Sequence, residues 1–320
     1  MVAVGYTLMC EQTGPKELVD QAVRAENAGF DYLVISDHYY PWLESQGHSP
    51  YAWSVLGAVA HATSRVGLMS FVTCPIRRYH PAVVAQKAAT VGVLSDGRFT
   101  LAVGAGENLN EHVVGAWPHV QQRHEMFEEA LQIIRPLLDG NTLTYSGHHF
   151  EVPEAYLWDR PEVPVSMAVA ASGPSSCQLA AEYGNAVVTD TPDAHVLRLF
   201  DQAGGTGRPR YGQVAFCYGQ DEDECRKIAH DQWRWSGLNW KVRAELPGPE
   251  SLTSASQFTR PEDTAQTVPC GPDLEAHAAA FRRYVDAGFT HVAVVQVGAD
   301  SQPMFLDWAR YELLPRLREF

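Results

Sequence analysis

The sequence of residues 66–103 is VGLMSFVTCPIRRYHPAVVAQKAATVGVLSDGRFTLAV. Its first part, Val66–Val72, is apolar and predicts a strand. Pro81–Leu94 predicts a helix, because proline is favoured at the first helical position and the residues after it are mostly helix formers. Phe99–Val103 predicts a second strand. A strand, a helix and another strand in succession are typical of a parallel βαβ unit, which places the chain in the α/β class.

The same alternation extends in both directions along the chain. Further strands are expected at Val2–Met9, Tyr32–Ser36, Val165–Ala170, Ala186–Thr189, Gly212–Tyr218 and His291–Val297. Helices are expected at Pro15–Ala28, Ala52–Ala62, Gln121–Leu138, Pro174–Tyr183, Asp193–Gln202, Glu222–Trp235, Asp273–Ala287 and Pro303–Leu317. Two segments break the rhythm: residues 142–156 predict a surface hairpin turning at Ser146–Gly147, and residues 238–271 predict a partly irregular excursion over one face.

Eight apolar strands alternating with helices predict a (β/α)8 TIM barrel occupying residues 1–320 as one domain, with the two segments as insertions. The rival is a doubly wound open sheet, which usually has fewer strands and a G-x-G-x-x-G motif after the first one. Here the first strand is followed by Cys10-Glu11-Gln12-Thr13-Gly14, which is no dinucleotide motif. The barrel is therefore favoured.

Composition excludes several classes of protein. The chain has 320 residues, 45% of them hydrophobic, and a formal net charge of -14. That much apolar sequence argues against disorder, and the negative charge argues against binding to nucleic acid or to an anionic membrane. The six cysteines form no C-x-x-C motif, no apolar run reaches 18 residues, and no basic segment opens the chain. We therefore expect reduced thiols, no membrane span and a cytoplasmic protein.

Active sites of such barrels lie at the carboxyl ends of the strands, so the residues that follow each strand are the candidates. Ionisable, aromatic and glycine-rich residues gather there. They are Glu11 after the first strand, Asp37, His38 and Trp42 after the second, Cys74 after the third, Gly104–Glu111 after the fourth, Ala171–Ser176 after the fifth and Thr189–Thr191 after the sixth.

Each candidate also has a structural explanation. Asp37 and His38 could form a capped loop with a surface histidine, or a proton-transferring pair at a pocket mouth. Trp42 could pack in the core or cover a ligand, and Glu107 could be a loop acceptor or an acid/base group. Ser172–Ser176 could be an ordinary helix cap or an anion site. No hydrolase, P-loop or metal-ligand motif occurs, so no metal site is expected and a metal-dependent hydrolase has little support.

Four motifs in order resemble the bacterial luciferase-like superfamily, and most closely its coenzyme F420-dependent oxidoreductase branch, which includes glucose-6-phosphate dehydrogenases. They are Ile35-Ser36-Asp37-His38-x-x-Pro41-Trp42, Tyr79-x-Pro81-Ala82-Val83-x-Ala85-Gln86, Val103-Gly104-x-Gly106-Glu107-x-Leu109-Asn110-Glu111 and Gly115-Ala116-Trp117-Pro118. The resemblance implies a homodimeric barrel that binds the deazaflavin coenzyme F420 at its carboxyl face. It also implies a cis peptide bond between Phe71 and Val72.

The resemblance further implies roles for individual residues. His38 would exchange a proton with the substrate oxygen, Glu107 would do so with the deazaflavin ring, Trp42 would cover the reacting carbon, and Glu11 would be a further pocket carboxylate. The cofactor would be held by residues from four loops. They are Asp37, Phe71, Val72, Cys74, Asn108, Asn110, Ala171, Ser172, Gly173 and Ser175, with the last four near the phosphate of the cofactor tail.

One departure from the family narrows the expected substrate. Members that oxidise sugar phosphates hold the phosphate with lysines, but this chain has Thr191-Pro192-Asp193 at one such place and no lysine in residues 242–320. We therefore expect glucose 6-phosphate to be a poor substrate, and an uncharged sugar, alcohol, ketone or imine to be the small-molecule partner. Two alternatives stay open: an FMN-dependent monooxygenase of the same superfamily, and a non-catalytic flavin-binding barrel.

Overall fold

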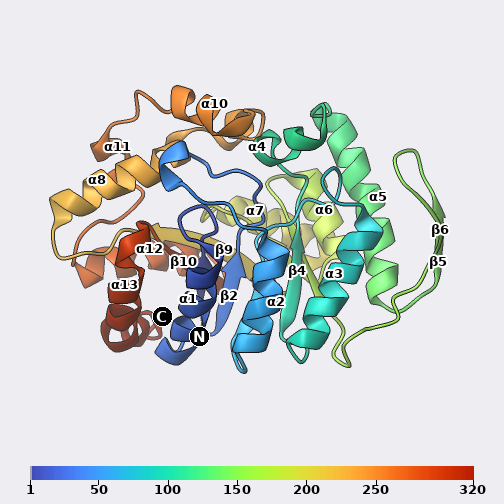
Figure 1. Cartoon of the computed structure of the whole chain (residues 1–320), viewed down its shortest axis with the longest axis horizontal. Coiled ribbons are helices and arrows are strands. Elements are labelled where there is room, and N and C mark those ends of the chain that lie inside the picture. Colours follow the sequence, from blue (N-terminus) through green and yellow to red (C-terminus); the bar gives the residue numbers. More distant parts are fainter. Residues whose placement is uncertain (1) are drawn as a thin grey trace.

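The computed structural model describes residues 2–320 and contains a closed barrel of eight parallel strands (Figure 1). Neighbouring strands are hydrogen-bonded in the order β1-β10-β9-β8-β7-β4-β3-β2. The strands are β1 (Ala3–Leu8), β2 (Tyr32–Ile35), β3 (Gly67–Ser70), β4 (Phe99–Val103), β7 (Ser166–Ala170), β8 (Ala186–Val188), β9 (Arg210–Phe216) and β10 (His291–Gln296). The predicted TIM barrel is thereby confirmed.

One main helix follows each strand and packs on the outside of the barrel (Figure 1). These helices are α1 (Pro15–Ala28), α2 (Ala52–Ala62), α3 (Pro81–Leu94), α5 (Val120–Leu138), α6 (Pro174–Tyr183), α7 (Ala194–Phe200), α12 (Leu274–Ala287) and α13 (Gln302–Trp308). Helix α1 ends at Gly29, whose φ of 105° is the left-handed conformation that glycine adopts without steric cost. The last helix continues as η6 (Ala309–Leu313) and α14 (Leu314–Leu317).

Alternate residues of each strand face opposite sides of the barrel wall. Leu33 and Ile35 of β2 belong to the large cluster that packs against the helices, whereas Tyr32 and Val34 belong to a smaller cluster. That smaller cluster fills the barrel interior mainly with small side chains, among them Ala102, Ala168, Ala186 and Ala293. The two-residue period of the strands thus separates the interior from the helix-facing layer.

The third strand is shorter than predicted. It ends at Ser70 instead of Val72, and the peptide bond between Phe71 and Val72 is cis, as the family resemblance implied. Pairing with β4 resumes at the single bridge between Thr73 and Val103. The segment after β3 therefore leaves the regular ladder at the rim where the candidate residues gather.

Both predicted insertions are present. β5 (Leu143–Ser146) and β6 (Glu151–Ala155) form an antiparallel hairpin on the outside, and its turn spans residues 147–150, slightly later than predicted. Residues 238–271 contain α9 (Trp240–Arg243), α10 (Gly248–Ala255) and α11 (Pro261–Ala265). Figure 1 shows α10 beside α4 (Asn108–Glu111), and α11 beside α8 (Glu222–Trp233), over one end of the barrel.

Short helical turns complete the connections. They are η1 (Glu44–Gln46), η2 (His112–Val114), η3 (Asp201–Gly205), η4 (Arg234–Gly237) and η5 (Ala299–Ser301). Within residues 2–320, no helix is both long enough and apolar enough to cross a membrane.

Candidate active site

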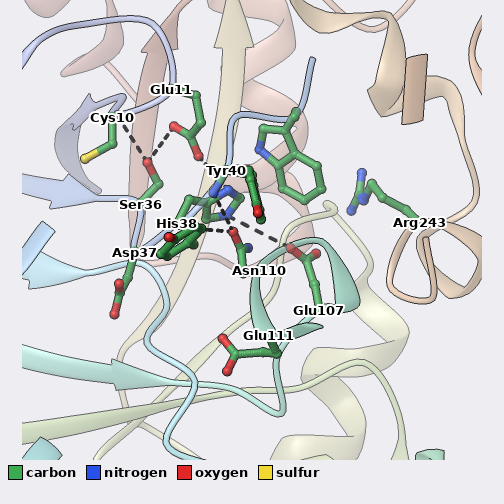
Figure 2. Close-up of polar contacts among 12 residues, drawn as sticks. Cys10, Glu11, Ser36, Asp37, His38, Tyr40, Glu107, Asn110, Glu111 and Arg243 are labelled. Atoms are coloured by element: carbon green, nitrogen blue, oxygen red, sulfur yellow. Dashed lines mark hydrogen bonds and ion pairs between the residues drawn. The ribbon is translucent and has the colours of Figure 1, made fainter. Parts of the chain in front are cut away.

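Three side chains from three loops meet at the carboxyl end of the barrel (Figure 2). His38, after β2, places its Nδ1 2.9 Å from Oε1 of Glu11, which follows β1. The opposite ring nitrogen, Nε2, lies 4.0 Å from Oε2 of Glu107, which follows β4. The imidazole therefore lies between two carboxylates. The fold brings together these three residues, which the sequence predicted to lie at the same rim.

Glu11 is buried without exposed surface, and its other oxygen accepts a hydrogen bond. Ser36 Oγ donates to Glu11 Oε2 at 2.7 Å, and the same hydroxyl accepts from the amide of Cys10 at 3.3 Å. A buried carboxylate that is fixed in this way orients the histidine ring and determines which ring nitrogen faces the pocket.

The arrangement perturbs all three titrating groups. Burial alone would lower the pKa of His38, but Glu11 and Glu107 raise it above its ordinary value. Burial would raise the pKa of Glu11, but His38 and the Ser36 hydroxyl lower it. The pKa of Glu107 is raised because burial outweighs the stabilising charges of Arg243 and His38. The site therefore favours a charged His38–Glu11 pair beside a carboxyl that holds its proton more tightly than usual.

Aromatic side chains form one wall of this site. The His38 and Trp42 rings lie 4.8 Å apart between centroids, and Trp42 stacks on Trp235 at 4.0 Å with 8° between the ring planes. The guanidinium of Arg243 lies 5.3 Å from the Trp42 ring centroid and 5.0 Å from that of Trp235. Trp42 is only 8% exposed, so it is at once part of the core and part of the wall beside His38.

Asp37 does not face this wall. Its Oδ2 accepts from Trp53 Nε1 at 3.1 Å and from Thr73 Oγ1 at 2.8 Å, and its Oδ1 accepts from Tyr79 at 3.0 Å. Arg78 Nη1 lies 3.6 Å from the same carboxylate. Its oxygens are thus already occupied by protein donors, so Asp37 anchors the loop that carries His38. A direct contact between Asp37 and the cofactor stays a prediction.

The two asparagines of the β4 loop have different surroundings. Asn110 Oδ1 accepts from the amides of Tyr39 at 2.9 Å and Tyr40 at 3.3 Å, which ties the β4 loop to the β2 loop. Asn108 donates from Nδ2 to the carbonyl of Glu245 at 2.8 Å, while its Oδ1 is buried and has no hydrogen-bond partner in the protein. A buried acceptor without a partner is a candidate ligand contact.

Cys74 lies against the glycine turn of the β4 loop. A Cβ added at Gly106 would lie 2.4 Å from the Cys74 Sγ, and the φ of Gly106 is 82°. A Cβ at Gly104 would lie 2.8 Å from Cγ2 of Val72. These glycines let the segment with the cis bond and the β4 loop pack closely, and burial raises the pKa of the Cys74 thiol, which disfavours the reactive thiolate.

The loop after β7 forms the predicted small-residue turn before α6. Ala171 is buried, whereas Ser172 and Ser175 are exposed. The amides of Ser172 and Gly173 donate to the hydroxyl of Ser176 at 3.0 and 3.2 Å. A Cβ at Gly173 would meet no atom within 4 Å, so this turn faces open space at a helix N-terminus. The geometry suits an anion but does not by itself identify one.

Sequence reasoning missed the contribution of residues 243–245. Arg243 pairs with Asp190 of the β8 loop at 3.2 Å and covers the tryptophan wall, and Glu245 binds Trp117 and Arg123. The insertion has no periodic pattern, so no signal in the sequence indicated that it reaches the site. Throughout residues 2–320, no group of three or more His, Cys, Asp or Glu side chains is arranged to hold a metal ion.

Comparison with known proteins identifies relatives of the whole chain. The family described as luciferase-like monooxygenase matches residues 3–291. An F420-dependent glucose-6-phosphate dehydrogenase of Beutenbergia cavernae is 36% identical over 99% of this chain and 98% of its own length. An F420-dependent hydroxymycolic acid dehydrogenase of Mycobacterium tuberculosis is 35% identical over 98% of this chain and 88% of its own length.

A solved structure is similar at the level of the backbone as well. An F420-dependent secondary alcohol dehydrogenase, in complex with an F420–acetone adduct, superposes with a TM-score of 0.90. It is 27% identical in sequence, and the match covers 99% of both chains. Together these matches confirm the resemblance predicted from the four sequence motifs.

Proposed function

We propose that this chain, which belongs to the luciferase-like monooxygenase family, is a coenzyme F420-dependent oxidoreductase. Its reaction would move a hydride between the cofactor and an uncharged alcohol or sugar, or the corresponding ketone, or an imine. The observation that carries the proposal is the position of His38 between Glu11 at 2.9 Å and Glu107 at 4.0 Å. The choice of cofactor follows from the relatives, which are F420-dependent dehydrogenases.

The cofactor supplies a carbon that accepts or donates a hydride, and the protein supplies orientation and proton transfer. In our proposal, Nε2 of His38 faces the substrate oxygen, because Nδ1 is engaged by Glu11. Neutral His38 takes the hydroxyl proton when an alcohol is oxidised, and protonated His38 returns it when a ketone is reduced. Glu11 stabilises the protonated form in both directions.

Glu107 takes the second acid/base role. Its side chain is 28% exposed, which leaves it open to a ligand, while that of Glu11 is 1% exposed. A carboxyl with a raised pKa holds its proton to a higher pH than an ordinary one and can exchange it with a ring nitrogen or oxygen of a bound deazaflavin. Trp42 excludes water from the same space, because its indole packs against the imidazole.

The residues present fit the cofactor at three places. The unpartnered Oδ1 of Asn108 can accept a hydrogen bond from the cofactor's polar ring edge, and Phe71 and Val72, joined by the cis bond, can offer it an apolar support. The open turn before α6 offers the exposed hydroxyls of Ser172 and Ser175, at a helix N-terminus, for a phosphate. These placements, like those of Cys74 and Asn110, belong to the proposal.

The uncharged substrate class follows from the charges around the pocket. Arg243 is the cation that covers the tryptophan wall, and it is paired with Asp190. A phosphate dianion would have to compete with that aspartate and would be repelled by Glu107 when it is ionised. The aromatic wall of Trp42 and Trp235 instead suits an apolar or ring-shaped surface.

Turnover with a matched set of substrates tests the proposal. The purified protein is mixed with oxidised F420 and 2-propanol, glucose or glucose 6-phosphate, and F420 reduction is followed by its visible absorbance. We expect turnover with at least one uncharged substrate and poor turnover with glucose 6-phosphate. Efficient use of glucose 6-phosphate would overturn the substrate class, and oxygen consumption with reduced FMN would move the function to a monooxygenase. The homodimer and the cytoplasmic location both stay predictions. Light scattering tests the homodimer.

A further inference from the structure

Residues 243–245 dock onto the loop that carries Glu107. The amide of Asn108 donates to the carbonyl of Ala244 at 2.9 Å, and Asn108 Nδ2 donates to the carbonyl of Glu245 at 2.8 Å. Asn108 is the residue next to Glu107, so these bonds fix the backbone that carries the Glu107 side chain. We call residues 243–245 the strap.

The far end of the strap is held by an ion pair. Glu245 Oε1 accepts from Arg123 Nη2 at 2.5 Å, and Glu245 Oε2 accepts from Trp117 Nε1 at 3.1 Å. Arg123 is on α5 and its side chain is 7% exposed, so it is a stable anchor. The strap therefore joins the insertion to the barrel at two points rather than lying loosely over the rim.

The near end of the strap places Arg243 over the site. Its side chain is 12% exposed and lies across the stacked Trp42 and Trp235 rings, with Asp190 Oδ2 3.2 Å from Nη2. Figure 2 shows Arg243 reaching from the insertion towards Glu107. Asp190, from the β8 loop, is 58% exposed, so a change there perturbs a charge rather than the core.

His38 Nε2 lies 4.0 Å from Glu107 Oε2, and three further charged groups, from the strap, the β8 loop and the β1 loop, influence the same carboxyl. Arg243 from the strap and His38 from the β2 loop favour its ionised form, whereas Asp190 from the β8 loop and Glu11 from the β1 loop disfavour it. His38 and Glu11 are themselves paired. That leaves Arg243 and Asp190 as an adjustable pair of opposite sign.

We propose that Arg243 and Asp190 are positioning residues of opposite sign that together set how readily Glu107 releases its proton. The strap holds Arg243 in place, and Asp190 limits the effect of its charge. The inference deepens the proposed function, on which it rests for the role of Glu107 in catalysis. The effect on the Glu107 carboxyl itself needs neither cofactor nor substrate to be bound.

The test is a pH titration of the protein without cofactor. Protein labelled with 13C at the glutamate carboxyls is titrated by NMR, and the Glu107 signal is assigned by its loss in Glu107→Gln. We expect Arg243→Met to move the Glu107 midpoint to higher pH and Asp190→Asn to move it to lower pH. Arg243→Lys, which keeps the charge, should stay closer to the wild type than Arg243→Met.

Opposite shifts of the Glu107 midpoint distinguish the proposal from a structural role. A mere loosening of the strap would move the midpoint in the same direction in both variants. Midpoints that stay unchanged, or that move in the same direction in Arg243→Met and Asp190→Asn, would overturn it. Binding and turnover of F420 by the wild type are measured separately. If F420 fails there while the midpoints still move apart, the proposed function falls and the assignment of Arg243 and Asp190 stands.

Discussion

Replacing Glu11 with Gln removes a charge from behind His38 while keeping the size and polarity of the side chain. Ser36 can still bond to the amide, and residue 11 itself has no exposed surface at which water could replace the lost charge. The imidazole then lies beside a neutral group on its Nδ1 side, at the 2.9 Å position that the carboxylate occupied. The charged form of His38 loses its main partner.

The size of the effect follows from that distance. Two unit charges 2.9 Å apart attract by about 6 kcal/mol at an effective dielectric constant of 20. Burial of both groups offsets much of this attraction, since desolvation opposes the charged form of each. What remains keeps the pKa of His38 above its ordinary value, and Glu11→Gln is expected to lower that pKa.

The rates of the two reaction directions depend on pH with opposite slopes. Alcohol oxidation needs neutral His38, so its rate rises with pH through the pKa of His38, and this rise should move to lower pH in Glu11→Gln. Ketone reduction needs protonated His38, so its rate falls with pH, and the fall should also move to lower pH. At neutral pH the reduction should lose part of the roughly 10²–10⁴-fold that general acid–base catalysis contributes.

The assay follows F420 absorbance against pH in both directions, with 2-propanol and acetone as probe substrates. Ser36→Ala is the matched control, because it removes the hydroxyl that bonds to Glu11 but keeps the carboxylate charge. Its pH profile should stay near that of the wild type. A Glu11→Gln profile that is unchanged, or that moves to higher pH, would refute the role given to the His38–Glu11 pair.

Three further predictions test other parts of the structure. His38→Ala and Glu107→Ala should each lower turnover by about 10²–10⁴-fold, and full activity in either would remove that residue from the mechanism. Gly106→Ala should destabilise the protein by about 1–3 kcal/mol in urea unfolding, because its φ is 82° and the new Cβ would meet Cys74 Sγ. Burial lowers the pKa of Lys87 to about 8, so the folded state binds fewer protons than the unfolded one above that pH. Wild-type stability should therefore rise relative to that of Lys87→Met as pH increases from about 8 to 10. An equal dependence of stability on pH in the two proteins would contradict this expectation.

The fold and much of the site could be predicted because both depend on local patterns. Parallel strands in a closed barrel end at the same rim, so the residues that follow them, such as Glu11, His38 and Glu107, had to be neighbours. Pro15–Ala28 and Pro81–Leu94 begin and end where their capping residues indicate. The motifs then identified which branch of the family the rim resembles.

The remaining features depend on tertiary contacts that no spacing encodes. No pattern in the sequence indicated that donors from three segments, Trp53, Thr73 and Tyr79, bond to the oxygens of Asp37. The strap belongs to an insertion without periodicity, and Arg243 reaches the site only because Glu245 and Asn108 hold its neighbours. Sequence patterns predicted which loops meet, whereas the direction of each side chain depended on packing.

The central claim, that the site takes coenzyme F420, is tested most directly by a fluorescence titration. The chain has eight tryptophans, and Trp42 and Trp235 lie stacked in the wall of the site, so a bound ring should quench emission. The protein is titrated separately with F420 and with FMN. The account predicts tight, saturable quenching by F420 and weak binding of FMN. Preference for FMN, or no binding of either, would contradict it.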